Sequence, residues 1–247
     1  MSEKYINSPI QEALCEFAYR SNKPWDLTIP GLVYDRIKEQ FPIKRYSMAY
    51  GISTEERERT AKPKIEFAQR IQFVNDKNDI LVQIGQNILS INHLSPYSSW
   101  ENFKPQIINV FNIYTRITEP EKLSQIALRY INRIVLKKTN IEIEDYFRFF
   151  PSLPKEIPDN FNVFHMVAGI PYRENLDKLQ ISIGSVSPNN PEENYVNIIL
   201  DIHYSTTDVE KKSVDEISNW IEQAHLIIGH TFEKCITDKC REIFKGE

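Results

Sequence analysis

Apolar side chains recur at every second position from Ala13 to Tyr19, within the segment Ile10–Arg20. A period of two predicts a strand with one buried face. Three further strand-like segments are separated by turn-forming residues, and they cover Ile65–Val74, Ile80–Gly85 and Ile88–His93. Their short spacing predicts antiparallel hairpins.

Helical spacing occurs twice in this half of the chain. Pro30 opens and Pro42 closes a predicted short helix. Ser98 and Glu101 form a Ser-x-x-Glu capping box, which marks the start of a helix. Large apolar residues then recur every three or four positions, at Trp100, Phe103, Ile107, Phe111 and Tyr114. This second segment is predicted to be an amphipathic helix that covers a sheet.

The second half repeats this order of elements. A strand over Gln125–Leu136 precedes a short helix near Ile143–Phe149 and a proline-rich loop, and a capping box at Ser213 and Glu216 opens a long final helix. Three strands lie between that loop and the final helix, at Val163–Ile170, Leu179–Gly184 and Tyr195–Tyr204. Ser213 lies 115 positions after Ser98, and Gln125 lies 115 positions after Ile10. The equal offsets indicate an internal duplication.

The sequence therefore predicts an α+β fold made of two tandem strand–helix–three-strand–helix units, at about residues 8–118 and 123–245. The units would form one compact domain over 1–247, with a largely antiparallel sheet covered by long helices. The element order resembles a duplicated TATA-box-binding-protein-like fold, which implies an architecture and not DNA binding. The alternative is that the two halves look alike by chance, since they share negligible residue identity.

Charged residues follow the same strand alternation. Glu12 and Glu16 share one face of the first strand, and Arg129 and Arg133 share one face of the Gln125–Leu136 strand. One antiparallel register would pair Glu12 with Arg133 and Glu16 with Arg129, and such pairs would fix the register more than they add stability. The alternative is a metal or acid–base site formed by the two carboxylates. Residues four apart on a strand lie about 13 Å from each other, which is too far for one metal ion.

The composition limits the partners. The net charge of -4 and the pI of about 5.8 disfavour nucleic acid binding, because the field of the whole molecule repels phosphate backbones. One run contains Arg57, Arg59, Lys62 and Lys64, but glutamates interrupt it, and it is interpreted as a solvated loop. The N-terminus lacks the apolar core of a signal peptide and no stretch is apolar enough to span a membrane, so we expect a cytoplasmic protein without a membrane partner.

Signatures of catalysis are weak. Seven unclustered glycines argue against a phosphate-binding loop, and no Gly-x-Ser-x-Gly motif occurs. The three cysteines do not suggest a disulfide framework, because Cys235 and Cys240 would lie on different faces of one predicted helix. Glu222 and His225 form a single Glu-x-x-His pair, which lacks the second copy that di-iron bundles use. We expect no catalytic residue, metal ion or cofactor.

Three segments are similar to a known group of proteins: Pro9–Glu16, Ile91–Phe103 and Leu128–Ile134. Together they resemble an uncharacterised, sporadically distributed family of bacterial and archaeal proteins of about this length. The resemblance covers nearly the whole chain and implies no established activity, cofactor or catalytic residue. The patchy distribution of that family is typical of genes on mobile or defence islands.

The leading hypothesis is a non-enzymatic binding or adaptor protein with a protein partner or self-association, as part of a prokaryotic defence or stress system. The alternative is a small-molecule-binding protein or an enzyme, with a pocket between the sheet and the C-terminal helix near Arg129, Arg133, Tyr130 and Asn132. The candidate ligand or partner residues are Tyr130, Asn132, Tyr97 and Trp100.

Overall fold

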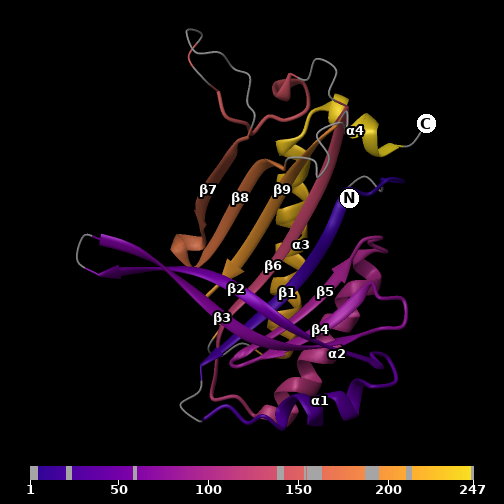
Figure 1. Cartoon of the computed structure of the whole chain (residues 1–247), viewed down its shortest axis with the longest axis vertical. Coiled ribbons are helices and arrows are strands. Elements are labelled where there is room, and N and C mark those ends of the chain that lie inside the picture. The colour runs from indigo at the N-terminus through magenta and orange to yellow at the C-terminus, as the bar shows by residue number, and fades with distance from the viewer. Residues whose placement is uncertain are drawn as a thin grey trace. The chain divides into compact units, whose positions relative to one another are not determined.

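A computed structural model describes residues 5–20, 24–57, 60–137, 142–152, 154, 163–186, 195–209 and 213–245, and for 48–68 it describes the backbone alone. The chain combines helices with antiparallel strands that follow one another in runs, which confirms the α+β class (Figure 1). The chain divides into an N-terminal unit, Cys15–His93 with Ser98–Gln125, and a C-terminal unit, Met1–Leu14 with Leu94–Tyr97 and Ile126–Glu247. Leu94–Tyr97 and the start of the first strand thus belong to the C-terminal unit.

The N-terminal unit contains the second half of β1 and four further strands in the order β2-β3-β4-β5-β1. The bounds are β1 Ile10–Arg20, β2 Ile43–Arg57, β3 Thr60–Val74, β4 Ile80–Gly85 and β5 Ile88–Leu94. Four strands therefore lie between the first two helices, where the sequence predicted three. The missed strand, β2, pairs along its whole length with β3, from Ile43 opposite Val74 to Arg57 opposite Thr60.

The charged run interpreted as a loop belongs largely to this hairpin. Arg57 lies in β2, and Lys62 and Lys64 lie in β3, while Arg59 is outside the described residues. The loop interpretation is therefore wrong for these three positions. Hydrogen bonding to a neighbouring strand overrides the local preference of a polar segment, and a single-sequence pattern does not contain that information.

Two helices complete the N-terminal unit, α1 (Ile29–Ile37) and α2 (Trp100–Thr118). The hydroxyl of Ser99 caps α2 by accepting a hydrogen bond from the Asn102 N–H at 3.3 Å. The predicted cap, Ser98, is wrong by one residue, because its hydroxyl instead lies 2.8 Å from Nε2 of His93. This contact satisfies the polar ring of the buried His93.

The C-terminal unit contains the start of β1 and four strands in the order β1-β6-β9-β8-β7. The bounds are β6 Lys122–Lys137, β7 His165–Tyr172, β8 Asp177–Val186 and β9 Tyr195–Thr206, with short 3-10 helices η1 Ile143–Asp145 and η2 Arg173–Asn175. The pairs β6–β9, β9–β8 and β8–β7 are all antiparallel. All four strands predicted in this half are confirmed, with ends that shift by a few residues.

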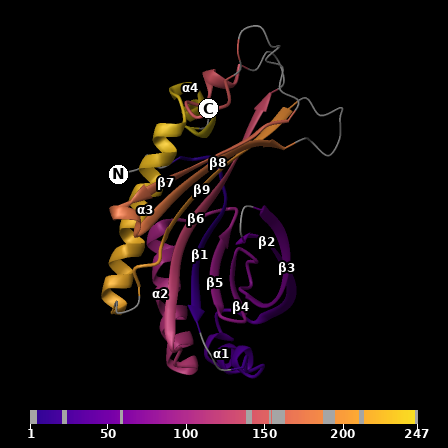
Figure 2. The same cartoon turned by 90° about the vertical axis from the view of Figure 1, so that its left-hand side faces the viewer.

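Helix α3 (Val214–Cys235) lies along one face of these strands, and α4 (Asp238–Lys245) follows it (Figure 2). The capping box predicted for Ser213 and Glu216 is confirmed, because each side chain bonds the backbone N–H of the other. The prediction of one helix carrying both Cys235 and Cys240 is wrong, since Ile236 has an extended backbone and separates two helices. None of the described helices combines the length and the apolar character that a bilayer crossing requires.

Candidate functional site

The sheet of the C-terminal unit has two faces of opposite character. On one face, alternate residues of β6, β8 and β9 are buried, among them Tyr130, Ile181 and Tyr204. Helix α3 packs on this face, where the indole of Trp220 stacks on the Tyr204 ring with centroids 5.6 Å apart. The remaining alternate residues form the other face, here named the polar face, and they include Arg129, Ile131, Arg133 and Val135 of β6, Asn197, Ile199, Asp201 and His203 of β9, Lys178, Gln180, Ser182 and Val186 of β8, and His165 and Val167 of β7.

Arg129 and Asp201 form a bidentate ion pair on the polar face. Nε of Arg129 donates to one carboxylate oxygen at 2.8 Å, and Nη2 donates to the other at 2.5 Å. Arg129 stands directly opposite His203, so Asp201 is its diagonal neighbour on β9. Two parallel charge-assisted bonds fix the guanidinium plane, so Arg129 is held in one orientation while 41% of its side chain stays exposed.

Arg133 has the same diagonal geometry with a different kind of partner. It stands opposite Ile199, and its Nε donates to Oδ1 of Asn197 at 2.9 Å. A guanidinium carries five N–H donors. The four N–H donors on the two Nη atoms of Arg133 make no hydrogen bond to any residue that the structure describes. Arg133 is therefore an exposed cation, oriented by a neutral amide, with most of its donors available.

A third polar pair joins the last two strands. Nε2 of His165 lies 2.8 Å from Oγ of Ser182, again across a diagonal, because His165 stands opposite Gly184. A serine hydroxyl bonded to an imidazole has the geometry of a nucleophile and its base, but activation needs a third group to orient the base. Among the described residues, no hydrogen bond reaches the other ring nitrogen of the exposed His165. The pair therefore provides polar contacts rather than an activated serine.

The predicted partners of the charged strand residues need correction. The backbone N–H of Arg133 donates to the carbonyl of Pro9 at 2.8 Å, so the register that places Arg133 opposite Glu12 is wrong by three residues. Glu16 accepts hydrogen bonds from Arg70 and Ser90 of its own unit, at 3.2 and 2.8 Å, instead of pairing with Arg129. Glu12 lies half-buried on β1.

The predicted ion pairs are wrong because β6 has a neighbouring strand on each side. The sequence prediction considered β1 alone, whereas β9 supplies Asp201 and Asn197. A signal for these residues was present, because Asn197 and Asp201 are four positions apart, as are Arg129 and Arg133. In an antiparallel pair, equal spacing lets two contacts form in one register.

Three of the four candidate ligand residues of the sequence prediction lie in the interior, and the fourth, Tyr97, is half-buried. Asn132 is buried and donates to the carbonyl of Leu200 at 3.0 Å. Tyr130 is buried on the face that α3 covers, where its hydroxyl lies 3.3 Å from the Tyr97 hydroxyl and 3.0 Å from Nδ1 of His225. Trp100 is a buried residue at the start of α2, 6.4 Å from the ring of Phe103.

The predicted pocket near Arg129, Arg133, Tyr130 and Asn132 is therefore not formed by these four residues. Successive strand residues point to opposite faces, so the two arginines lie on the polar face and the other two residues beneath α3. Tyr97 and Tyr130 do meet, and His225 joins them. The sequence contained no signal for that third member.

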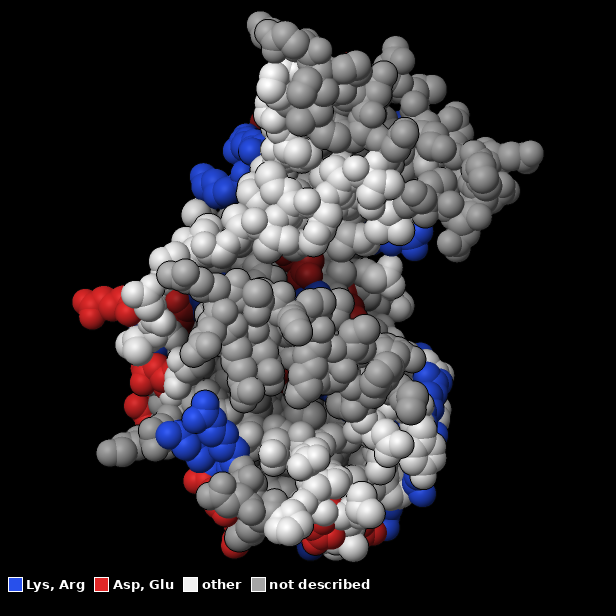
Figure 3. Space-filling model, turned by 60° about the vertical axis from the view of Figure 1, so that its left-hand side comes forward, with Lys and Arg blue, Asp and Glu red and all other residues white. Residues whose placement is uncertain are grey.

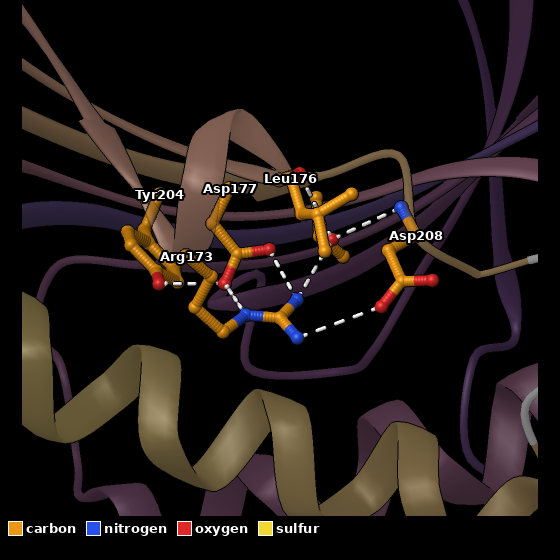
Figure 4. A network of polar contacts seen from close by, with 6 residues as sticks. Arg173, Leu176, Asp177, Tyr204 and Asp208 are labelled. Atoms are coloured by element: carbon orange, nitrogen blue, oxygen red, sulfur yellow. Dashed lines mark hydrogen bonds and ion pairs between the residues drawn. The ribbon is translucent and has the colours of Figure 1, made fainter.

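A buried carboxylate closes the turn between β7 and β8 (Figure 4). Only 2% of the Asp177 side chain is exposed, and it accepts two hydrogen bonds from Arg173, both at 2.6 Å, and one from the Tyr204 hydroxyl at 2.7 Å. Burial alone would raise the pKa of Asp177, but hydrogen bonds from Arg173, Thr206 and Tyr204 hold it below its ordinary value. Asp177 therefore stays ionised and acts as an anchor for the turn.

This anchor offsets backbone strain in the turn. Arg173, Glu174 and Asn175 all have positive φ, at 42°, 55° and 72°. Residues other than glycine adopt this conformation at a cost, and they hold it only where the surroundings enforce it. The bidentate Arg173–Asp177 ion pair holds the turn in this conformation, so Arg173, Asp177 and Tyr204 have a structural role. Sequence reasoning missed it, because nothing local marks Asp177 as buried.

Nucleophilic thiol chemistry has no support in the described residues. Burial raises the pKa of the Cys235 thiol to about 11 and of the Cys240 thiol to about 12, and it raises the pKa of Cys15 as well. All three cysteines are free and buried, so they are neutral thiols at pH 7. Within the described ranges, no group of three or more His, Cys, Asp or Glu side chains could hold a metal ion.

Charges on the surface are mixed. On the face drawn in Figure 3, the coloured Lys and Arg side chains lie in separate small groups, and Asp and Glu side chains occur among them.

Comparisons with models of protein families, with curated proteins and with solved structures find no match for this chain.

Proposed function

We propose that this chain is a non-enzymatic binding protein that holds an acidic segment of a partner protein against the polar face of its C-terminal unit. Arg133 is the central contact in this proposal. The observation that carries it is the state of that guanidinium: exposed, oriented by Asn197, and with four N–H donors that bond no described residue.

The chemistry of the free donors selects the ligand. A guanidinium with unused Nη donors forms paired, charge-assisted hydrogen bonds with a carboxylate. Because Arg129 is already matched by Asp201, it adds little net charge and serves as a fixed neighbour. An Asp or Glu side chain of the partner would therefore bind at Arg133 and not at Arg129.

Apolar residues around the arginines favour a protein as the partner. Val135, Val167 and Val186 lie on the polar face and are 46%, 51% and 48% exposed. Protein interfaces combine an arginine anchor with apolar contacts that exclude water from it. A partner that covers these valines would strengthen the ion pair at Arg133 by lowering the local dielectric constant.

The pull-down test compares a charge reversal on the polar face with one elsewhere. Tagged wild-type protein, Arg133→Glu and the control Lys234→Glu, an exposed position on α3, are captured from a lysate of the source organism and quantified by mass spectrometry. We expect a partner that wild type and Lys234→Glu enrich equally and that Arg133→Glu loses at least tenfold, since removing a central arginine costs about 2 kcal/mol or more. Equal recovery by all three proteins would contradict the proposal.

We also propose that the chain carries two pseudo-repeats, at about 8–118 and 123–245. The order of a long strand, a short helical element, consecutive antiparallel strands and a long helix supports this, since β1, α1 and α2 correspond in order to β6, η1 and α3. Strand β2 is the departure from the pattern. Cytoplasmic action in a prokaryotic defence or stress system is the remaining part of the proposal, and it depends on the family resemblance alone.

A further inference from the structure

Strand β7 ends the strand order of the C-terminal unit. It pairs with β8 on one side, and no described strand pairs on its other side. In Figure 1, β7 lies at the outer end of the group β6, β9, β8 and β7. The described part of the chain therefore presents β7 as a sheet edge, and this observation is independent of Arg133.

The register shows which backbone groups face outward. The Ser185 N–H donates to the carbonyl of Phe164 at 3.0 Å, which makes Phe164 and Ser185 a hydrogen-bonded pair in the β7–β8 register. Hydrogen-bonded and non-hydrogen-bonded pairs alternate along an antiparallel ladder. The backbone groups of His165, Val167 and Gly169 therefore point away from β8, as does the carbonyl of Pro171, which has no N–H.

The segment His165–Gly169 of β7 contains no residue that protects a sheet edge. Natural proteins block free edges with charged residues, most often lysine, or with proline, and the one proline of β7, Pro171, lies beyond this segment. None of the eight residues of β7 is Asp, Glu, Lys or Arg, and Val167 and Ile170 are 51% and 39% exposed. An uncharged, partly apolar edge favours the addition of another strand.

A second copy of β7 matches this edge. With Val167 opposite Val167 of the partner copy, His165 stands opposite Gly169, so a large side chain meets a small one. The three outward N–H groups of each strand then meet three carbonyls of the other, and Pro171 falls outside the paired segment. No charged side chains face each other in this register, because the strand contains none.

We infer that two copies of this chain associate through antiparallel pairing of their β7 strands, with Val167 on the two-fold axis. The pairing joins the two C-terminal sheets edge to edge. Each polar face then continues onto the polar face of the second copy. The dimer would present two Arg133 anchors to a partner protein.

Disulfide trapping tests the register. Residues in a hydrogen-bonded antiparallel pair have Cα atoms about 5.5 Å apart, which suits a disulfide. We expect Val167→Cys to form a covalent dimer under mild oxidation, seen on a non-reducing gel. The matched control is Val186→Cys, an equally exposed valine on β8, which should stay monomeric. The three native cysteines are buried and should give no background.

Light scattering of the native protein tests the association itself. Wild type is expected to have the mass of a dimer at micromolar concentration. Val167→Lys should raise the dimer dissociation constant at least tenfold while the circular dichroism spectrum stays unchanged, because it places like charges opposite each other. A monomeric wild type, an unaffected Val167→Lys dimer, or equal trapping at both cysteine positions would overturn the inference. Each of these results leaves the Arg133 proposal intact, since the pull-down measures a different contact.

Discussion

Replacing Asp177 with Asn is expected to lower the free energy of unfolding by about 3 kcal/mol at pH 7. The carboxylate is 2% exposed and accepts hydrogen bonds from Arg173 and Tyr204. An amide cannot accept both Arg173 bonds, so the strained turn from Arg173 to Asn175 loses the ion pair that holds it. Urea denaturation followed by circular dichroism measures the change. Lys178→Ala, an exposed neighbour on β8, should stay within about 0.5 kcal/mol of wild type.

The same pair of proteins gives a pH dependence with a defined sign. The folded-state pKa of Asp177 lies below its ordinary value of 3.8, so the folded protein binds fewer protons than the unfolded chain at acid pH. The stability that Asp177 contributes is therefore complete above about pH 4 and is lost as the pH falls through the folded-state pKa. We expect the gap between wild type and Asp177→Asn to shrink on acidification. A gap that stays constant or widens would show that the carboxylate is not the anchor.

Phe17→Ala is expected to cost about 3–5 kcal/mol. The Phe17 ring is completely buried on β1, and its centroid lies 4.5 Å from that of Phe111 on α2. The substitution leaves a cavity where the helix covers the strand, and small domains have only about 5–15 kcal/mol in total. The loss is measured as a shift of the urea midpoint. Leu32→Ala on α1, at a residue that is 53% exposed, provides the control with an expected change below about 0.5 kcal/mol.

Much of the fold could be predicted where the pattern is local. The period of two marks β1 with its exact bounds, and turn residues mark both ends of β4. The capping box at Ser213 marks the start of α3. Two consecutive serines, Ser98 and Ser99, precede α2. The sequence does not show that the Ser98 hydroxyl forms a hydrogen bond with His93, which leaves Ser99 as the cap. A choice of this kind depends on a residue from another element.

The polar face could be predicted only in part. Strand alternation correctly places Arg129 and Arg133 together, but their partners depend on which strand lies beside β6. Tyr130 and Asn132 looked like site residues because they stand between the two arginines in sequence, and the same alternation turns them to the buried face. Asn197 and Asp201 are four residues apart, as are Arg129 and Arg133, and this equal separation is the sequence signal that points to the observed pairs.

The central claim is that the polar face of the C-terminal unit contacts a partner protein, and site-specific photo-crosslinking tests it without removing any side chain from the anchor. A photoreactive amino acid replaces Val135, which lies on the polar face two residues from Arg133, or Leu226, which is 53% exposed on α3. After irradiation in living cells, we predict covalent protein adducts at position 135 and none at position 226. Adducts only at position 226, or at neither position, would contradict the claim.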